Sequence, residues 1–443
     1  MNYRTLSAPL VVQIENTWVC NHRCGPCSNA VRHCEATRPT MSRDQIDVVV
    51  AELVKCEVPR AIITGGEPLL VRRQTYYLAE QLQRAEIRYS LNTNATLATP
   101  EDATVLKQYG MSGVMISLHG DTAELHDELT GVPGSWLRGT AGLRIFAEAG
   151  VDITANMVVT GRNAHRVLET GRLARSFGAS TFQASKVCVP SSVLDHFQLS
   201  LPTPPQIRTS LDSLLLLEQE TGMRIGIGTP YPWCVLEDAA RYARFCGKFC
   251  GAGIVTAYIG PTGDVLACGM IAEPSGNLFR EGLAAPWSRL TELRSRRLPD
   301  ACMACGHKLR CAGGCYHEGR LASDKIPCRP GLGEGLVQTV PPRRRPVPVT
   351  DTTQFRFAED TVLRQESFGG VISDGSQSTL VDSTTFGICR ALRATGAFSV
   401  LYAANRFQVA VDEARDVLSR LAGQQLIRLV APVSETKGKE VSQ

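Results

Sequence analysis

The chain has 443 residues, which is enough for about two to four domains with sizeable cores. Its net charge of +4 is mild, so charge alone does not favour a nucleic-acid partner. No run of about 18 apolar residues exists, and the N-terminus lacks the apolar segment of a signal peptide, so we expect neither a membrane span nor secretion. Clustered cysteines in an intracellular chain favour metal ligands over disulfides, and we expect a cytoplasmic protein.

Strand-like and helix-like runs alternate over the first 187 residues. Strands are expected at residues 11–17, 61–64, 89–91, 113–118, 151–159 and 181–187. Helices are expected at residues 42–56, 74–84, 101–108, 138–149 and 164–177, the first of them capped by Ser42. Six β/α units predict a parallel sheet with right-handed crossovers, and in such sheets the chemistry lies at the carboxyl ends of the strands.

Three cysteines follow the first strand, at Cys20, Cys24 and Cys27. Four thiolates would close a zinc or iron–sulfur site, whereas three thiolates on a cubane cluster leave one iron open to a small molecule. A zinc site usually brings a second pair of ligands at matching spacing, and neither His22 nor His33 completes one. Spacing alone leaves the open cluster, a zinc site and three unrelated thiols as alternatives.

Other polar or glycine-rich positions end the later strands. Gly65-Gly66-Glu67-Pro68 ends the second strand, and paired glycines let a backbone approach a ligand closely, although a tight turn would have the same composition. Ser117 ends the fourth strand. Asn156 lies within the apolar fifth strand and needs hydrogen-bond partners, which a ligand or a neighbouring strand would provide.

The second half of the chain begins with a proline- and serine-rich connection at residues 190–205, followed by a helix at 207–217 and a short strand at 223–228. After Trp233 the cysteines become dense and regular structure is hard to predict. The second cysteine field comprises Cys250, Cys268, Cys302, Cys305, Cys311, Cys315 and Cys328. Zinc ribbons are the alternative to iron–sulfur clusters here.

The last part of the chain is predicted to be a separate small domain. Residues 336–350 are rich in proline and arginine and read as an extended linker. Beyond it, a hairpin at 361–372, a third strand at 378–381 and helices at 386–394 and 409–421 suggest a winged-helix form. The helices are not notably basic, so we expect no nucleic-acid partner.

The first cysteine loop resembles that of the radical S-adenosylmethionine (SAM) enzymes. The resemblance continues through Gly65-Gly66-Glu67-Pro68, Ser117-Leu118-His119-Gly120 and the second cysteine field, which resembles a SPASM domain. It covers about three quarters of the chain. It implies an α/β fold with a partial (β/α)6 radical SAM barrel at 1–230, an irregular Cys-rich SPASM domain at 231–335, the linker at 336–350 and a winged-helix-like α+β domain at 351–443.

The resemblance also implies roles for single residues. Cys20, Cys24 and Cys27 would bind the radical SAM [4Fe–4S] cluster. SAM would be contacted by Gly65, Gly66, Glu67, Pro68, Ser117 and Asn156. The family often has an aromatic residue before the third cysteine, where this chain has Pro26, and His119 replaces an aspartate of the peptide-maturase relatives.

Two auxiliary [4Fe–4S] clusters are implied in the same way. Cys250, Cys268 and Cys315 would bind one of them, with Cys246 as our choice of fourth ligand and Cys234 as the reserve. The other would be bound by Cys302, Cys305, Cys311 and Cys328. We interpret Cys34, Cys56, Cys188 and Cys389 as ordinary buried thiols. Gly269 replaces the aspartate of anaerobic sulfatase maturases, which counts against that activity.

The C-terminal segment resembles the PqqD-like peptide chaperones, also called RiPP recognition elements. The match rests on Leu363-Arg364, Phe368-Gly369-Gly370, Leu380-Val381-Asp382 and the closing residues 421–430. Such domains bind the leader of a precursor peptide by adding it as a strand to an exposed sheet edge.

Together the resemblances imply a radical SAM oxidoreductase that matures a ribosomally made peptide (RiPP). A reductant such as flavodoxin or ferredoxin would supply the electron that cleaves SAM. The 5′-deoxyadenosyl radical formed in this way would abstract hydrogen from the peptide. We expect an oxidative C–C or thioether crosslink, because epimerases do not need two auxiliary clusters. The alternatives are a radical SAM/SPASM oxidoreductase or epimerase acting on a small molecule, and a non-enzymatic iron–sulfur scaffold that presents peptides. No side chain is identified as catalytic.

Overall fold

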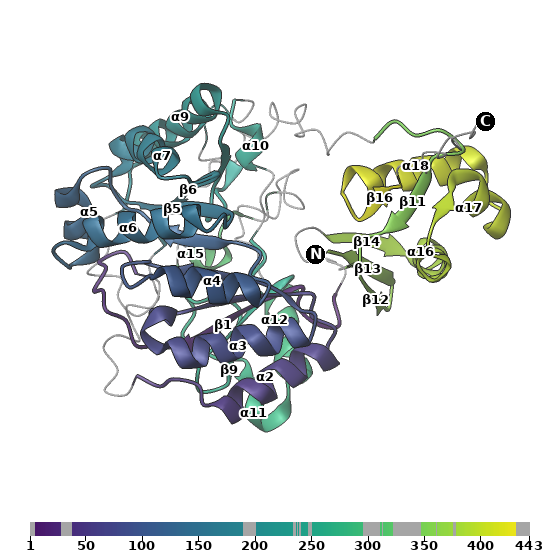
Figure 1. Ribbon diagram of the computed structural model, residues 1–443, viewed down its shortest axis with the longest axis horizontal. Helices are drawn as coiled ribbons and strands as arrows, with labels where there is room; N and C mark the ends of the chain where they lie inside the picture. The colour runs from purple at the N-terminus through teal and green to yellow at the C-terminus, as the bar shows by residue number, and fades with distance from the viewer. Residues whose placement is uncertain are drawn as a thin grey trace, which may run out of the picture. The chain divides into compact units, whose positions relative to one another are not determined.

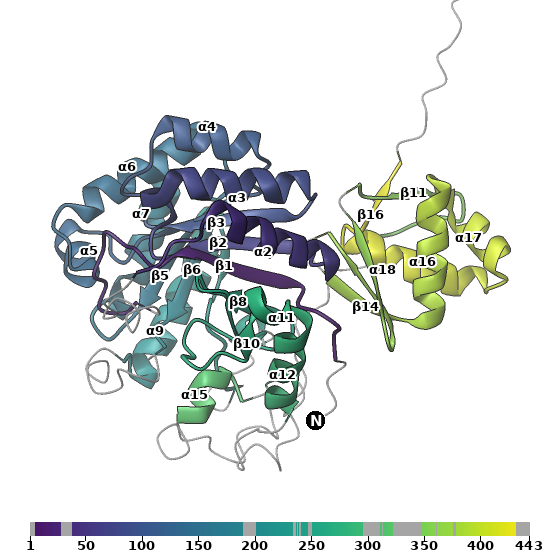
Figure 2. The same cartoon turned by 90° about the horizontal axis from the view of Figure 1, so that it is seen from below.

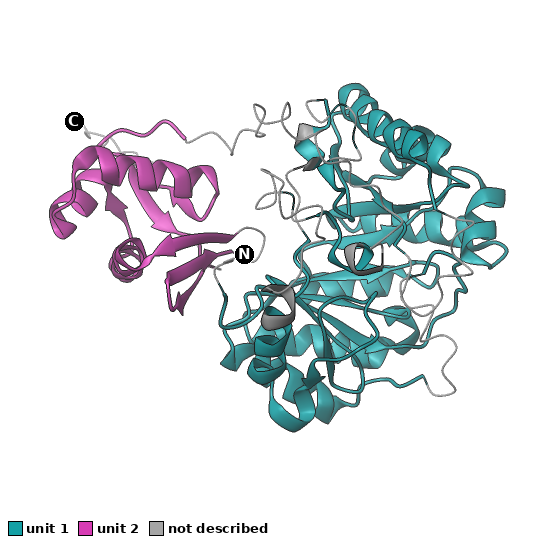
Figure 3. Ribbon diagram, turned by 180° about the vertical axis from the view of Figure 1, so that it is seen from behind, with its two compact units in different colours: residues 1–341 teal, residues 342–443 magenta. Residues whose placement is uncertain are grey.

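The computed structural model describes residues 5–27, 38–188, 201–233, 236, 238, 241–246, 250–295, 311, 313–321, 347–359, 361–374 and 378–430. The chain forms two compact units, residues 1–341 and 342–443 (Figure 3). No helix in these residues is long and apolar enough to cross a membrane.

A parallel sheet organises unit 1 (Figure 1). Its first six strands pair in chain order, each parallel to the next. They are β1 (Val11–Thr17), β2 (Arg60–Gly65), β3 (Arg88–Thr93), β4 (Val114–Ser117), β5 (Ile153–Val159) and β6 (Thr181–Lys186). The prediction of a six-stranded parallel sheet is confirmed, and the carboxyl ends of these strands lie at one edge of it.

Helices connect the strands. They are α2 (Arg43–Lys55), α3 (Arg72–Arg84), α4 (Pro100–Gln108), α5 (Ala123–Thr130), α6 (Ser135–Glu148) and α7 (Val167–Ser176), with 3₁₀ turns η1 (Pro68–Val71) and η2 (Ala164–Arg166). Ser42 and Gln45 form a capping box at the start of α2, as its sequence predicts. Helix α5 was not predicted; its eight residues are too few to show a helical period.

The sheet extends beyond the six strands on both sides. Strand β7 (Arg224–Gly226) follows α9 (Pro204–Thr221) and pairs with β6. On the other side, β8 (Thr256–Ile259) pairs with β1, followed outward by β9 (Asp264–Leu266) and β10 (Gly276–Asn277). The Cys-rich region therefore contributes strands to the main sheet, which the sequence did not indicate. Its helices are α10 (Ala243–Cys246), α11 (Leu278–Glu281), α12 (Ala284–Ser295) and α15 (Tyr316–Leu321). In Figure 2, α3, α4 and α6 lie on one side of the central strands, and α12 and α15 on the other.

The two faces of the sheet differ in polarity. Along β3 to β6, the buried positions are apolar apart from Thr93 at the end of β3, and they include Leu91, Ile116 and Phe182. The positions between them are half-buried and many are polar, such as Ser117 and Asn156. Because successive side chains of a strand point to opposite faces, one face forms the apolar core and the other is a polar surface.

Unit 2 contains two small antiparallel sheets. One is formed by β12 (Val362–Glu366), β13 (Gly369–Ser373) and β14 (Ser378–Asp382), and the other by β11 (Gln354–Phe357), β15 (Phe398–Ser399) and β16 (Ile427–Leu429). Helices α16 (Ser383–Thr395), α17 (Val400–Phe407) and α18 (Val411–Gly423) share a core with them that includes Phe355, Phe386 and Phe398. The predicted hairpin and third strand are present, whereas α17 and the second sheet were not predicted.

Candidate active site

The first cysteine loop follows β1 at the carboxyl edge of the sheet. Cys20, Cys24 and Cys27 are half-buried, and the backbone N–H of His22 donates to Cys20 Sγ at 3.4 Å. Burial raises the pKa of Cys20 to about 12, and repulsion from Cys27 adds to the rise. The pKa of Cys24 is raised still further by burial and by the other two thiolates. Burial and the charges of the neighbouring thiolates disfavour ionisation of Cys20 and Cys24, so a cationic metal group would suit this set because it would stabilise the thiolates.

The glycine turn after β2 holds the beginning of this loop. The Gly66 N–H donates to Thr17 O at 2.7 Å, and the Glu67 N–H donates to Val19 O at 2.8 Å. A Cβ on Gly66 would lie 2.1 Å from Val19 O. Gly65 has φ +133°, and a Cβ there would lie 2.3 Å from Thr17 O. The two glycines therefore let the cysteine loop pack directly on the turn, and their predicted contact with SAM stays a prediction.

The Glu67 carboxylate is buried and joins the glycine turn to the end of β3. Its Oε1 accepts from Thr93 Oγ1 at 2.7 Å and from Leu69 N at 2.9 Å, and its Oε2 accepts from Asn94 N at 2.7 Å. Burial raises the pKa of Glu67, and these donors oppose the rise. Asn94 Nδ2 in turn donates to Asn21 Oδ1 in the cysteine loop at 2.8 Å. Glu67 thus acts as a brace, and the adjoining Pro68 begins the buried turn η1.

Helix α5 holds the other side of the loop. The Arg23 N–H donates to Thr130 O, and the Gly25 N–H donates to Leu129 O, each at 3.0 Å. Gly131 ends the helix with φ +66°, and a Cβ there would lie 2.9 Å from Arg23 O. The backbone of the cysteine loop is therefore held between the glycine turn and α5 by contacts of the protein itself.

His119 and His126 are buried behind the loop. The His119 N–H donates to His126 Nδ1 at 3.1 Å, and the Val158 N–H donates to His119 Nδ1 at 3.3 Å. Burial lowers the pKa of His119 to about 3 and that of His126 to about 4. Both rings are therefore neutral near pH 7 and link the ends of β4 and β5 to α5.

The polar face of the sheet lies beyond the loop. Ser117 pairs with Asn156 across β4 and β5, and Asn156 pairs with Gln183 on β6. Asn156 Oδ1 accepts from Ser185 Oγ at 2.7 Å, while the Ser117 hydroxyl has no hydrogen-bond partner among the described residues. Gln183 and Ser185 were not identified from sequence. The alternation of polar residues along residues 181–185 was the signal that would have found them.

Part of the second cysteine field lies within the described residues. The N–H of Met270 donates to Cys268 Sγ, and that of Trp233 donates to Cys311 Sγ, each at 3.4 Å. The Cys315 side chain hydrogen-bonds with those of Cys250 and Cys188. The interpretation of Cys188 as a thiol without cysteine partners is therefore wrong, because β6 brings it to Cys315. Cys302, Cys305, Cys328, Cys34 and the Cys246 side chain lie outside the described residues.

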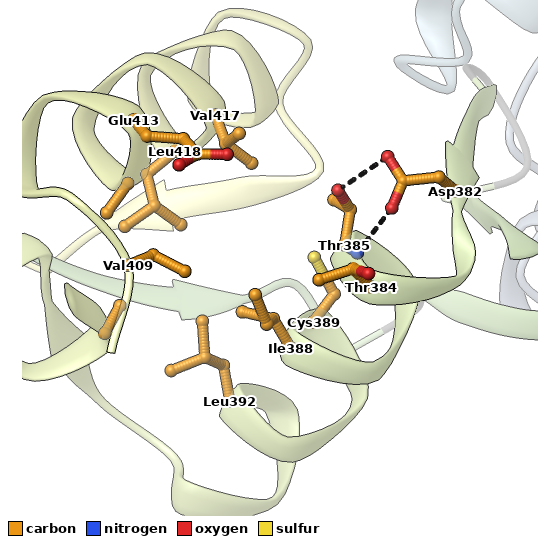
Figure 4. Close-up of a pocket in the computed structure, with 12 residues that line it drawn as sticks. Asp382, Thr384, Thr385, Ile388, Cys389, Leu392, Val409, Glu413, Val417 and Leu418 are labelled. Carbon is orange, nitrogen blue, oxygen red and sulfur yellow. Dashed lines mark hydrogen bonds between the residues drawn. The ribbon is translucent and has the colours of Figure 1, made fainter. Parts of the chain in front are cut away.

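Unit 2 contains a pocket of about 300 Å³ between its helices (Figure 4). Asp382, which ends β14, lies at one side of it and caps α16 by accepting from Thr385 N at 2.9 Å. The rest of the lining is mainly apolar, with Ile388, Leu392 and Val417 among its residues. The pocket therefore lies next to the end of an edge strand.

A family model that spans the first cysteine loop matches this chain, and so do curated relatives. Residues 17–174 match the model of the radical SAM superfamily. The mycofactocin maturase MftC of Mycobacterium tuberculosis is 30% identical over 321 residues, covering 70% of this chain and 79% of that protein. The AdoMet-dependent heme synthase of Methanosarcina barkeri is 25% identical over 323 residues, covering 69% of this chain and 91% of that protein.

Among solved structures, SuiB of Streptococcus suis bound to S-adenosylmethionine aligns with a TM-score of 0.59 at 20% identity, covering 74% of this chain and 78% of that chain. This likeness shows the fold. The matched superfamily implies a [4Fe–4S] cluster and SAM as cofactors. The sequence matches, with a three-cysteine loop at the carboxyl edge of a parallel sheet, show that the chain belongs to the radical SAM superfamily.

Proposed function

We propose that the protein is a radical SAM maturase of a ribosomally made peptide. The observation that carries the proposal is a braced loop with three half-buried thiols beside a polar sheet face, in a chain that is 30% identical to a mycofactocin maturase. SuiB, which shares the fold, has also been solved bound to its precursor peptide SuiA. A peptide is therefore the substrate class that the relatives support best.

In this proposal Cys20, Cys24 and Cys27 hold the cluster, whose unligated iron is left for SAM. When both cofactors are bound they supply a 5′-deoxyadenosyl radical, which abstracts hydrogen from an unactivated carbon. The backbone at Gly65 and Gly66 and the side chains of Ser117 and Asn156 would orient SAM. Ser117 suits this role because its hydroxyl remains available for a ligand.

The second cysteine field would hold two auxiliary [4Fe–4S] clusters. Cys250, Cys268 and Cys315 are assigned to one, and Cys302, Cys305, Cys311 and Cys328 to the other. The contact of Cys315 with Cys250 supports the first set, because the spacing of 65 residues between them does not by itself bring them together. Electron removal by such clusters favours an oxidative C–C or thioether crosslink over epimerisation.

Unit 2 would bind the leader of the precursor peptide. Strand β14 pairs with β13 on one side and has no partner on the other among the residues described for unit 2. Leu380 on β14 is 42% exposed and offers an apolar contact at this open edge. A leader added alongside β14 would pair through its backbone and could place an apolar side chain in the adjoining pocket.

The test is anaerobic incubation of the reduced protein with SAM and the peptide encoded beside its gene. We expect 5′-deoxyadenosine, formed faster with the peptide than without it, and none from the Cys24→Ala variant. No 5′-deoxyadenosine from the wild-type protein would support the scaffold alternative and overturn the proposal.

A second candidate function is radical chemistry on a small molecule, which the match to a heme synthase favours. It predicts that removal of residues 347–443 leaves substrate turnover intact. The maturase proposal predicts that the same truncation abolishes modification of a peptide with its leader and lowers its affinity.

A further inference from the structure

Cys188 is brought to the second cysteine field by the last strand of the six. It follows the end of β6 by two residues and is 5% exposed. Its Sγ, the Sγ of Cys315 and a carboxylate oxygen of Glu318 all lie within 4.8 Å of one another. Cys315 also contacts Cys250, so the Cys315 thiol has two cysteine neighbours from distant parts of the sequence.

A buried ion pair fixes this arrangement. Lys186 Nζ donates to the Glu318 carboxylate, and the two side chains are 10% and 12% exposed. The pair joins the end of β6 to α15, which begins directly after Cys315. A buried charge requires its partner, so this contact holds the Cys315 segment against Cys188.

The donor set favours thiolate ligation. Glu318 is engaged by Lys186, which leaves Cys188 and Cys315 as the available ligands of this group, with Cys250 beside Cys315. The other polar contacts of Cys188 are long, at 3.7 Å to Thr229 Oγ1 and 3.9 Å to Lys186 O. An ordinary buried thiol explains these contacts, but it does not explain the proximity of Cys188 to Cys315, which is already assigned to the cluster. Together with Cys250 and Cys268, which the proposed function assigns to the same cluster, the set would provide the four thiolates that a fully ligated [4Fe–4S] cluster needs.

We propose that Cys188 is the fourth ligand of the first auxiliary cluster, with Cys250, Cys268 and Cys315, in place of the Cys246 expected from sequence. The inference rests on the proposed function, because that function assigns the auxiliary cluster. Its consequence is mechanistic: four thiolates leave no open iron, so this cluster transfers electrons and does not bind the peptide. It also ties the Cys-rich region to the end of β6.

The experiment isolates the auxiliary clusters in a parent variant of the full chain that carries Cys20→Ala, Cys24→Ala and Cys27→Ala. Cys188→Ala, Cys188→Ser, Cys246→Ala and the control Cys56→Ala are added singly. Cys56 is a half-buried thiol outside both cysteine fields. Each protein is reconstituted anaerobically, and its iron and sulfide content and the EPR spectrum of the reduced sample are measured. Circular dichroism verifies the fold of each variant.

We expect Cys188→Ala to lose about four iron atoms per chain relative to the parent, and Cys246→Ala and Cys56→Ala to lose none. Cys188→Ser, which keeps an oxygen ligand, should retain more iron with an altered EPR spectrum. Unchanged iron and EPR in both Cys188 variants would overturn the inference and leave the proposed clusters standing. A parent without iron, or with zinc in its place, would refute the auxiliary clusters and the inference together.

Discussion

The buried Glu67 carboxylate allows a test that separates two roles. If Glu67 braces the cysteine loop, its substitution lowers the stability of the fold, whereas if it only contacts the cofactor, its substitution weakens SAM binding. Glu67→Gln keeps the shape of the side chain but replaces one acceptor oxygen with an NH₂ donor. If the amide oxygen still accepts from Thr93 and Leu69, the new NH₂ group faces the Asn94 N–H, so two donors oppose each other. The variant loses one hydrogen bond to a buried charged group and leaves a buried donor unsatisfied, but it also removes a buried charge. The net effect should lower the free energy of unfolding by about 2 to 4 kcal/mol.

The assay is urea unfolding of the iron-free protein, followed by measurement of SAM binding to the reconstituted protein. With an m-value of about 3 kcal/mol/M, the unfolding midpoint of unit 1 should fall by about 1 M. Glu80→Gln is the control, because Glu80 is half-buried on α3 and pairs with Arg84 on the same helix, an interaction worth about 0.5 kcal/mol or less. An unchanged midpoint combined with weaker SAM binding would refute the brace and make Glu67 a cofactor ligand.

Three further predictions concern the loop, the buried histidines and unit 2. Gly66→Ala places a Cβ 2.1 Å from Val19 O, so the cysteine loop must move, and we expect loss of the radical SAM cluster, measured as about four fewer iron atoms per chain. Lowering the pH from 6.5 to 5.5 should destabilise unit 1 by about 1 kcal/mol for each of His119 and His126, measured as a falling urea midpoint. Their folded pKa values of about 3 and 4 lie below the unfolded value, so the unfolded state binds more protons in this window. Leu380→Glu, on the exposed edge of β14, should weaken leader-peptide binding about tenfold in fluorescence polarisation.

Each of these predictions has its own control. Gly387→Ala adds a methyl group where no atom lies within 4 Å, so it should leave iron content unchanged. For the pH series, a midpoint that stays constant between pH 6.5 and 5.5 would contradict the neutral histidine pair. For the leader peptide, Leu429→Glu is the matched variant, since Leu429 is 50% exposed on β16; equal loss of binding in both variants would argue against β14.

The parallel sheet and the first cysteine loop could be predicted because their signals are local. Alternating β/α runs, the Ser42 cap and the spacing of Cys20, Cys24 and Cys27 are all short-range patterns. The strand ends then placed the glycine turn and Ser117 at one edge by a general rule of parallel sheets.

The remaining features depend on contacts between distant segments. Nothing in the sequence near Cys188 predicts its contact with Cys315, which lies 127 residues later. The contact forms only because the folded chain packs the end of β6 against the segment that contains α15. The roles of Gly66 and Glu67 were likewise hidden. Their composition suggested ligand contact, which stays a prediction, but gave no sign that they also hold the cysteine loop. Helix α5 was too short to show a period, although its end supports Arg23 and Gly25.

The most direct test of the central claim is the intact mass of a peptide encoded beside the gene, after anaerobic co-expression with this protein. An oxidative crosslinking maturase predicts the loss of two hydrogens from the peptide, and fragmentation would then locate the new bond. The Cys24→Ala variant should leave the peptide unmodified. An unchanged peptide mass with the wild-type protein, and no deuterium uptake in heavy water, would contradict peptide maturation and favour a small-molecule substrate.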